Sequence, residues 1–295
     1  MKAVFIMSET PTFLSSSKDI ENPDFTIVGL PYGADNSGRS GAESGPDAIR
    51  EASALIETYS PYLNGDLGSY SIKDQGNLDL SGNFPLQYIQ SEARTFFQAD
   101  TFPVFLGGNH AVTAPLIKAA YSVFPDLHVL ILDAHADLRD EYKGSQNNSV
   151  CTSRRIGDII GLDRIKIFGV RSGTMEEFKL VHENDLRVGL FEEDLEKMVR
   201  FLEKKPVYLS LDLDVFDPSL MPGTGMPEPG GITYNVFLEL CRRLRQITFV
   251  GFDVVELSPG LDTSGASPIL AASCVRELML LSKFNTPAKQ NAQGE

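Results

Sequence analysis

The chain has 295 residues, enough to bury about three quarters of its unfolded surface in one large domain or two smaller ones. Its formal net charge of −14 and its pI near 4.8 argue against a nucleic-acid or anionic-membrane partner, since phosphate groups would be repelled over most of the surface. A cationic small molecule would instead be attracted. Three cysteines, Cys151, Cys241 and Cys274, are far apart and form no CxxC pair, so we expect free thiols in a reducing compartment.

The two ends of the chain bear on localisation and on domain boundaries. The N-terminus lacks a basic region followed by an apolar stretch and a small-residue cleavage site, and no apolar run approaches about 18 residues. We therefore predict a cytoplasmic protein without a membrane-spanning helix. Residues 285–295, NTPAKQNAQGE, are polar and turn-prone, so we expect a flexible C-terminal tail after a single domain over residues 1–284.

Short apolar runs alternate with amphipathic stretches along the chain. The runs with strand character are, in order, 25–30 (FTIVGL), 102–106 (FPVFL), 128–133 (HVLILD), 164–170 (RIKIFGV), 206–214 (PVYLSLDLD) and 247–257 (ITFVGFDVVEL). The stretches with helical periodicity are 45–59, 112–124, 174–183, 191–205 and 266–283. This alternation predicts an α/β fold with three layers, α/β/α, and a mostly parallel sheet. In such sheets, sites form beyond the carboxyl ends of the strands.

Six residues of types that bind cations end three of these strands. They lie in the segments FLGGNH, LILDAHAD and LSLDLD, and they are His110, Asp133, His135, Asp137, Asp212 and Asp214. Carboxylates do not collect there unless something offsets their repulsion and desolvation, and a pair of divalent cations does so. In an extended chain alternate side chains share a face, so the ligands within each segment are expected on one face. Two imidazoles with four carboxylates and no cysteine favour Mn²⁺ over thiolate-bound zinc.

Each segment also has a simpler interpretation. An Asp at the end of a parallel strand often caps the following loop or helix, and a single His beside Gly108 and Asn109 could be a turn residue. Three such segments in one chain favour metal, so we predict a two-metal hydrolytic site. Two loops rich in Gly and Pro, residues 31–50 and 217–234, are expected beside it, with Pro46 starting a helix.

Several longer motifs resemble those of one known family. They are GGNH at 107–110, DAHADLRDEY at 133–142, GVRSGT at 169–174, SLDLDVFDP at 210–218, PGTGMPEPGG at 222–231 and GFDVVELSP at 251–259. In this order they resemble the ureohydrolases, and agmatinases most closely, over nearly the whole chain. The resemblance implies an arginase-like fold, two Mn²⁺ ions per subunit, a homotrimer or homohexamer, and hydrolysis of a guanidino group to urea and an amine. The implied substrate is agmatine, giving putrescine and urea, or a longer agmatine derivative of a polyamine pathway.

Family positions carry over residue by residue. They assign His110 and Asp137 to one manganese, His135 and Asp214 to the other, and Asp133 and Asp212 to both as bridges. Glu256 matches the glutamate that holds the guanidinium, which it would orient through charge-assisted, fork-like hydrogen bonds. The resemblance also implies that Asp137 passes a proton to the departing amine. Alternatively, Glu256 could merely cap the end of its strand.

The chain departs from the family at one position. Relatives usually have a proton-shuttling histidine in the loop after residue 142, and the aligned residue here is Ser149. His128 and His182 do not obviously replace it. Because serine does not titrate near neutral pH, the proton relay would depend on water or buffer. The metal ligands and Glu256 remain, so we predict reduced rather than absent activity.

The substrate tail has several interpretations. Arginases place small polar residues after this metal motif, whereas Asp140 and Glu141 here could meet the distal ammonium of a cationic substrate, although acidic loop residues are usually just solvated. A guanidino-acid or formiminoglutamate hydrolase would instead need a cationic clamp, for which Arg139 and Arg154 are candidates. A deacetylase on the same fold is disfavoured, because it normally needs one metal and six candidate ligands are present here. The remaining alternative is a noncatalytic polyamine-binding relative, which would release no urea.

Overall fold

The computed structural model describes residues 11–33, 38–39 and 41–284, so the tail predicted at 285–295 lies outside the described residues. Its main sheet has eight strands in the order β4-β1-β5-β10-β9-β6-β7-β8, and all the pairings in it are parallel. The strands are β1 (Phe25–Leu30), β4 (Ile72–Asn77), β5 (Phe102–Gly107), β6 (His128–Leu132), β7 (Ile165–Phe168), β8 (Arg187–Val188), β9 (Pro206–Asp212) and β10 (Thr248–Val255). A short antiparallel pair, β2 (Tyr59–Ser60) and β3 (Gly65–Asp66), is separate from this sheet.

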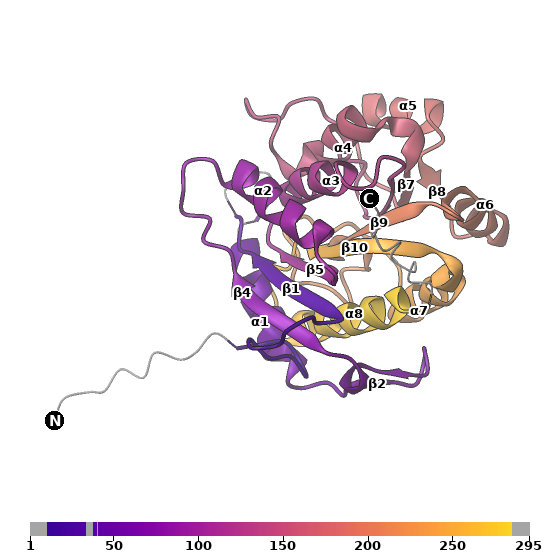
Figure 1. Ribbon diagram of the computed structural model, residues 1–295. Coiled ribbons are helices and arrows are strands. Elements are labelled where there is room, and N and C mark those ends of the chain that lie inside the picture. Colours follow the sequence, from indigo (N-terminus) through magenta and orange to yellow (C-terminus); the bar gives the residue numbers. More distant parts are fainter. Residues whose placement is uncertain (1–10, 34–37, 40, 285–295) are drawn as a thin grey trace, which may run out of the picture.

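Helices cover both faces of the sheet (Figure 1). On one face pack α1 (Gly45–Ser53), α6 (Glu192–Leu202), α7 (Tyr234–Arg243) and α8 (Ala266–Ser282); on the other pack α2 (Pro85–Gln98), α3 (Thr113–Tyr121), α4 (Thr152–Ile160) and α5 (Met175–Glu183). Because side chains of a strand alternate, Leu209 of β9 packs in the first layer and Tyr208 in the second. The three-layer α/β/α fold with a mostly parallel sheet is confirmed. Among the described residues, no helix is both long and apolar enough to cross a membrane.

The sequence patterns did not predict several elements that the structure describes, among them β4, α2, α4 and α7. The edge strand β4 has the polar sequence IKDQGN, and its buried Asp74 is paired with Arg50 of α1 at 2.9 Å rather than packed among apolar side chains. Helices α2, α4 and α7 were not singled out either. Pro46 stands in the first turn of α1, as expected, because a helix does not use the N–H that proline lacks there.

The expectation that the segments with the six polar residues remain extended was wrong for Asp137 and Asp214, whereas Asp212 still ends β9 and His135 forms an isolated parallel bridge with Ser172. β6 ends at Leu132, and Asp137 has a positive φ of 53°, which no extended chain has. Asp214 lies in the 3₁₀ turn η6 (Leu213–Val215) after the end of β9. The side chains therefore converge because the chain turns at the edge of the sheet, not because alternate residues of a strand share a face.

Candidate metal centre

The predicted site residues follow or end four consecutive strands in the middle of the sheet, β5, β10, β9 and β6. His110 opens the 3₁₀ turn η3 (His110–Val112) after β5, Asp133 follows β6, Asp212 ends β9, and Glu256 follows β10. Leu132 is level with Leu211, and Val255 with Asp212. Because these parallel strands end at one edge, residues more than a hundred positions apart in the chain meet there.

All six predicted ligands lie in one cluster. His110 Nδ1 is 3.2 Å from one carboxylate oxygen each of Asp133, Asp137 and Asp212. His135 Nδ1 is 2.8 Å from Asp214 Oδ2 and 3.6 Å from Asp133 Oδ1. Two groups of three could each hold a metal ion, namely His110, Asp133 and Asp212, and Asp133, His135 and Asp214. The two groups share Asp133.

The cluster fits metal ions better than it fits hydrogen bonds. One imidazole nitrogen carries at most one proton, so His110 Nδ1 cannot bond to three carboxylates at once. Within the described part of the chain, neither His110 Nδ1 nor Asp133 Oδ2 has a hydrogen-bond partner, although both are buried. Neighbouring ligands of an octahedral ion with bonds of about 2.1 Å stand about 3 Å apart. The spacing of 3.2 Å around His110 Nδ1 is close to that value.

Without cations the charges in the cluster oppose one another. Burial, and next the charge of Asp133, raise the pKa of Asp137 to about 7. Burial also raises the pKa values of Asp212 and Asp214. Burial would lower the pKa of His135, but the charge of Asp214 and the nearby carboxylate of Asp133 raise it to about 12. Divalent cations would offset the repulsion among these carboxylates and the cost of their burial.

Backbone N–H groups of the turns orient three of the carboxylates. Asp133 Oδ1 accepts from the N–H of His135 at 2.6 Å, Asp214 Oδ1 from that of Ala134 at 3.1 Å, and Asp212 Oδ1 from that of Asp214 at 2.9 Å. For Asp212 and Asp214 the other oxygen, Oδ2, faces an imidazole, whereas Asp133 faces His110 with Oδ2 and His135 with Oδ1. The capping interpretation is therefore correct for Oδ1 of Asp133 and of Asp212, which accept from the residue two positions later, but not for Asp214, which accepts from the distant Ala134; Oδ2 of each remains for a metal ion.

Glu256 lies beside this cluster with a restrained backbone. Its Oε1 accepts a hydrogen bond of 2.7 Å from the backbone N–H of His110, and its φ is 67°, a rare conformation for a residue other than glycine. A small cavity of about 20 Å³ is lined by Gly33, Gly38, Arg39, Gly41, Ala42, Glu43, Asn109, Gly225, Met226 and Glu256. Both glycine-rich loops contribute to it, and a Cβ added at Gly225 would lie 3.7 Å from Glu256 Oε2. Glu256 therefore faces a cavity walled by the two loops.

Ser149 is buried close to the cluster. It opens the 3₁₀ turn η4 (Ser149–Cys151), which contacts the η3 turn of His110. The backbone that follows it is tied to the segment 137–139, because Arg139 N donates to Val150 O at 3.3 Å and Arg154 N to Asp137 O at 3.0 Å. The loop expected to carry a proton-shuttling group thus lies against the turns of His110 and Asp137.

Three of the four charged residues predicted for the substrate tail already have partners. Asp140 is exposed and forms an ion pair of 2.6 Å with Arg155. Arg139 lies 3.5 Å from Glu177, and Arg154 lies 3.4 Å from Asp158. Glu141 is exposed. A carboxylate that the sequence did not single out, Glu43, lines the same cavity as Glu256, and its only sequence signal is its place in a glycine-rich loop.

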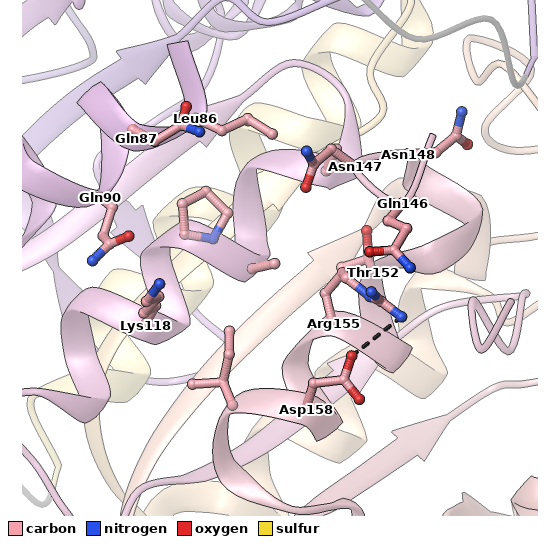
Figure 2. A pocket seen from close by; sticks show the side chains of 14 residues that line it. Leu86, Gln87, Gln90, Lys118, Gln146, Asn147, Asn148, Thr152, Arg155 and Asp158 are labelled. Atoms are coloured by element: carbon pink, nitrogen blue, oxygen red, sulfur yellow. Dashed lines mark ion pairs between the residues drawn. The ribbon is translucent and has the colours of Figure 1, made fainter. Parts of the chain in front are cut away.

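A second cavity, of about 260 Å³, lies between α2, α3, α4 and the loop 146–148 (Figure 2). It is lined mainly by amide and aliphatic side chains, together with Lys118 and the ion pair of Arg155 and Asp158 at 3.1 Å. None of the six predicted ligands lines it. Two of its lining residues, Ala111 and Asn148, are next in the chain to His110 and Ser149 respectively.

Comparisons with known proteins agree with this architecture. The model of the arginase family matches residues 23–281. An agmatinase of Bacillus anthracis is 37% identical over 275 residues, which cover 91% of this chain and 95% of that protein. A guanidinobutyrase of Pseudomonas aeruginosa is 31% identical over 90% of this chain and 88% of its own length. The crystal structure of a putative agmatinase from Clostridium difficile matches with a TM-score of 0.83 at 39% identity, over 88% of this chain and 96% of that one. The chain therefore belongs to the arginase family of ureohydrolases, and it is similar to agmatinases over nearly its whole length.

Proposed function

We propose that this protein is a binuclear Mn²⁺ amidinohydrolase that acts on agmatine or a longer agmatine derivative. The observation that carries the proposal is the pair of ligand groups that share Asp133, next to a cavity that Glu256 lines. A deacetylase with one metal would not need the second group. We also propose that the protein works in the cytoplasm as a trimer or hexamer, as the family resemblance implies.

The donor set supports manganese. Four carboxylates and two imidazoles suit a borderline-hard ion of this kind. Burial, and next the charge of Asp137, raise the pKa of the nearby Cys151 to about 11, so this cysteine stays a thiol and offers no soft thiolate ligand. His110 and Asp137 would hold one ion, His135 and Asp214 the other, and Asp133 and Asp212 both. When bound, two such ions supply a water activated for attack on the guanidinium carbon.

Glu256 and Asp137 would supply the remaining chemistry. A guanidinium is planar and carries several N–H donors, so a carboxylate can orient it through two parallel hydrogen bonds. Glu256 Oε1 already accepts from the His110 N–H, which fixes the carboxylate relative to the ligand turn. Glu256 would thereby hold the guanidinium in the cavity beside the ligand cluster, where the metal-activated water would attack its carbon. Asp137, whose carboxylate faces His110 alone, would pass the proton to the departing amine.

The end of the substrate away from the guanidino group, its tail, distinguishes agmatine, which ends in an ammonium, from a guanidino acid, which ends in a carboxylate. Three carboxylates are candidates for a distal ammonium: Asp140, Glu141 and Glu43. Glu43 lines the cavity of Glu256, whereas Asp140 is paired with Arg155. The net charge of −14 favours a cationic substrate in addition. A guanidino-acid tail would require Arg139 or Arg154 to leave its present carboxylate partner, and the guanidinobutyrase relative is the reason to test it.

The test is urea release by Mn²⁺-loaded protein from agmatine, aminopropylagmatine, arginine and guanidinobutyrate, with Asp133→Ala as the control variant. We expect release from the cationic amines only, and none from Asp133→Ala, since both ligand groups need Asp133. Release from guanidinobutyrate alone would favour the guanidino-acid alternative. Bound manganese without urea from any of the four compounds would favour a noncatalytic polyamine-binding protein.

A further inference from the structure

Behind His110 lies a buried polar group that the sequence motifs did not single out as functional. His110 Nε2, the nitrogen opposite the carboxylates, is 3.1 Å from Ser210 Oγ of β9. Ser210 Oγ in turn donates to Asp253 Oδ1 of β10 at 2.6 Å. Asp253 Oδ2 accepts from Tyr208 OH at 2.9 Å and from Thr113 Oγ1 at 3.0 Å. His110, Ser210, Tyr208, Thr113 and Asp253 are all fully buried.

The protons of this group can be assigned from its donors and acceptors. An ionised Asp253 can only accept, and each hydroxyl has one proton to donate. If Ser210 gives its proton to Asp253 at 2.6 Å, it can only accept from His110. In the neutral imidazole, the form that binds a metal, His110 Nε2 must then carry the ring proton, which leaves a lone pair on Nδ1. That lone pair points toward Asp133, Asp137 and Asp212.

We propose that Asp253, acting through Ser210, is a positioning residue that fixes the tautomer and ring orientation of His110 for metal binding. The inference rests on the metal site proposed above, and it adds a role for two buried polar residues that the reaction itself does not use. A metal-binding histidine commonly donates its second ring N–H to such a partner, and loss of the partner costs about 10- to 100-fold in metal affinity.

The geometry supplies a matched control. Ser210→Ala and Tyr208→Phe each remove one hydrogen bond to Asp253, but only Ser210 touches His110. Both variants should destabilise the metal-free protein because both leave a buried carboxylate with one donor fewer. Only Ser210→Ala should weaken metal binding. Asp253→Asn keeps the side-chain volume, but its amide can donate to Ser210 and so turn the serine proton toward His110.

The experiment is a titration of each metal-free variant with Mn²⁺, in which EPR follows the free ion, together with thermal unfolding of the metal-free proteins. We expect one of the two Mn²⁺ affinities to fall by about 10- to 100-fold in Ser210→Ala and Asp253→Asn, and both to stay unchanged in Tyr208→Phe. Equal losses of Mn²⁺ affinity in Ser210→Ala and Tyr208→Phe would mean that the buried polar group has only a general packing role. Native affinities in Asp253→Asn, or failure of both Ser210→Ala and Asp253→Asn to fold, would also overturn the proposal.

The outcome is separable from that for the proposed function. If the native protein binds no Mn²⁺ in the same titration, the metal site itself is wrong. If it binds two ions and the Ser210 and Asp253 variants bind them equally well, only the positioning role fails.

Discussion

The two histidines of the cluster stand in different surroundings. The side chain of His110 is completely buried, has three carboxylates around one nitrogen and has Ser210 on the other. The side chain of His135 is 16% exposed, and Nδ1 faces two carboxylates. Among the described residues, none hydrogen-bonds its Nε2. Water can reach the His135 ring, whereas His110 depends on the protein for each of its polar contacts.

This difference shows how burial changes what a ligand requires. A partly exposed imidazole can satisfy its second nitrogen with solvent, but a buried one needs an internal acceptor, since an unpaired buried N–H costs about 1–3 kcal/mol. The strands behind His110 accordingly contain polar residues, Ser210 and Asp253, among apolar neighbours. The half of the site that contains His110 should therefore be the more sensitive to mutations in the sheet.

The sharpest test compares the half of the site around His110 with the half around His135. In each half it replaces a carboxylate that is assigned to one ion only. Asp137→Asn should remove the ion on the side of His110, and Asp214→Asn the ion on the side of His135, each lowering the Mn²⁺ content from about two per chain to about one. Asparagine tolerates the positive φ of Asp137. In each case the lost affinity should exceed about 100-fold, because a direct ligand matters more than a group behind it. Elemental analysis after dialysis measures the content, and an equal loss of both ions in both variants would contradict the division into halves.

Substitution of Glu256 should affect substrate and spare the metals. In Glu256→Gln the amide oxygen can still accept from the His110 N–H, but the charge that pairs with the guanidinium is lost. Hydrogen bonds to charged groups contribute about 1.5–3 kcal/mol, so kcat/KM for agmatine should fall about 10- to 150-fold. The Mn²⁺ content is the control. Full activity in Glu256→Gln would mean that this residue only caps the end of its strand.

Ser149→His tests the missing proton shuttle on the side of His110. If the native protein relays the proton through water or buffer, the histidine should raise turnover by about tenfold or more near neutral pH. The wild-type rate should also depend more steeply on buffer concentration than the variant rate does. Thermal unfolding checks that the larger side chain fits this buried position. Equal turnover and equal pH profiles would rule out the idea that the absent histidine limits the enzyme.

The metal-free protein should lose stability as the pH rises. Folded Asp137 keeps its proton up to about pH 7, whereas the unfolded chain releases it near 3.8, so the free energy of unfolding falls through this window. The raised pKa of His135 continues the trend from 6.5 toward 12. We expect the melting temperature to fall from about pH 5 to about pH 8, and Mn²⁺ to stabilise more at the higher pH because it binds deprotonated ligands. Asp137→Asn should remove only its own share of the trend below about pH 7, because the raised pKa values of Asp212 and Asp214 act in the same direction, and a melting temperature that rises with pH would contradict the assignment.

The smallest expected effect concerns the substrate tail. Glu43 is exposed, so its charge interacts through solvent and contributes at most about 1 kcal/mol. Glu43→Gln should therefore raise KM for agmatine by no more than about fivefold and leave guanidinobutyrate unaffected. Asp140→Asn is the matched comparison, since that carboxylate is engaged by Arg155. A larger effect from Asp140→Asn than from Glu43→Gln would indicate that the substrate tail binds near Asp140, in the loop after Asp137, and not near Glu43.

The sequence predicted the composition of the site better than its geometry. Ligand types at the ends of apolar runs were enough to find His110, Asp133 and Asp212, because strand ends meet at one edge of a parallel sheet. The alternation argument placed Asp137 and Asp214 in extended chain, but Asp137 has a positive φ and Asp214 lies in a 3₁₀ turn. A period of two describes a strand, and it does not describe the turns that follow. Those turns depend on local hydrogen bonds, such as that from Asp214 N to Asp212 Oδ1 at 2.9 Å.

The sequence by itself determined the layer architecture and the residue types of the cluster, since apolar periodicity and charge placement are local properties of the chain. Only the tertiary structure decided which atoms meet. It brought Asp253 behind His110 from a strand that starts more than a hundred residues later, and it placed Glu43 in the cavity of Glu256. It also paired Asp140 with Arg155. Such contacts follow from strand order and crossover packing, which no pattern within one segment encodes.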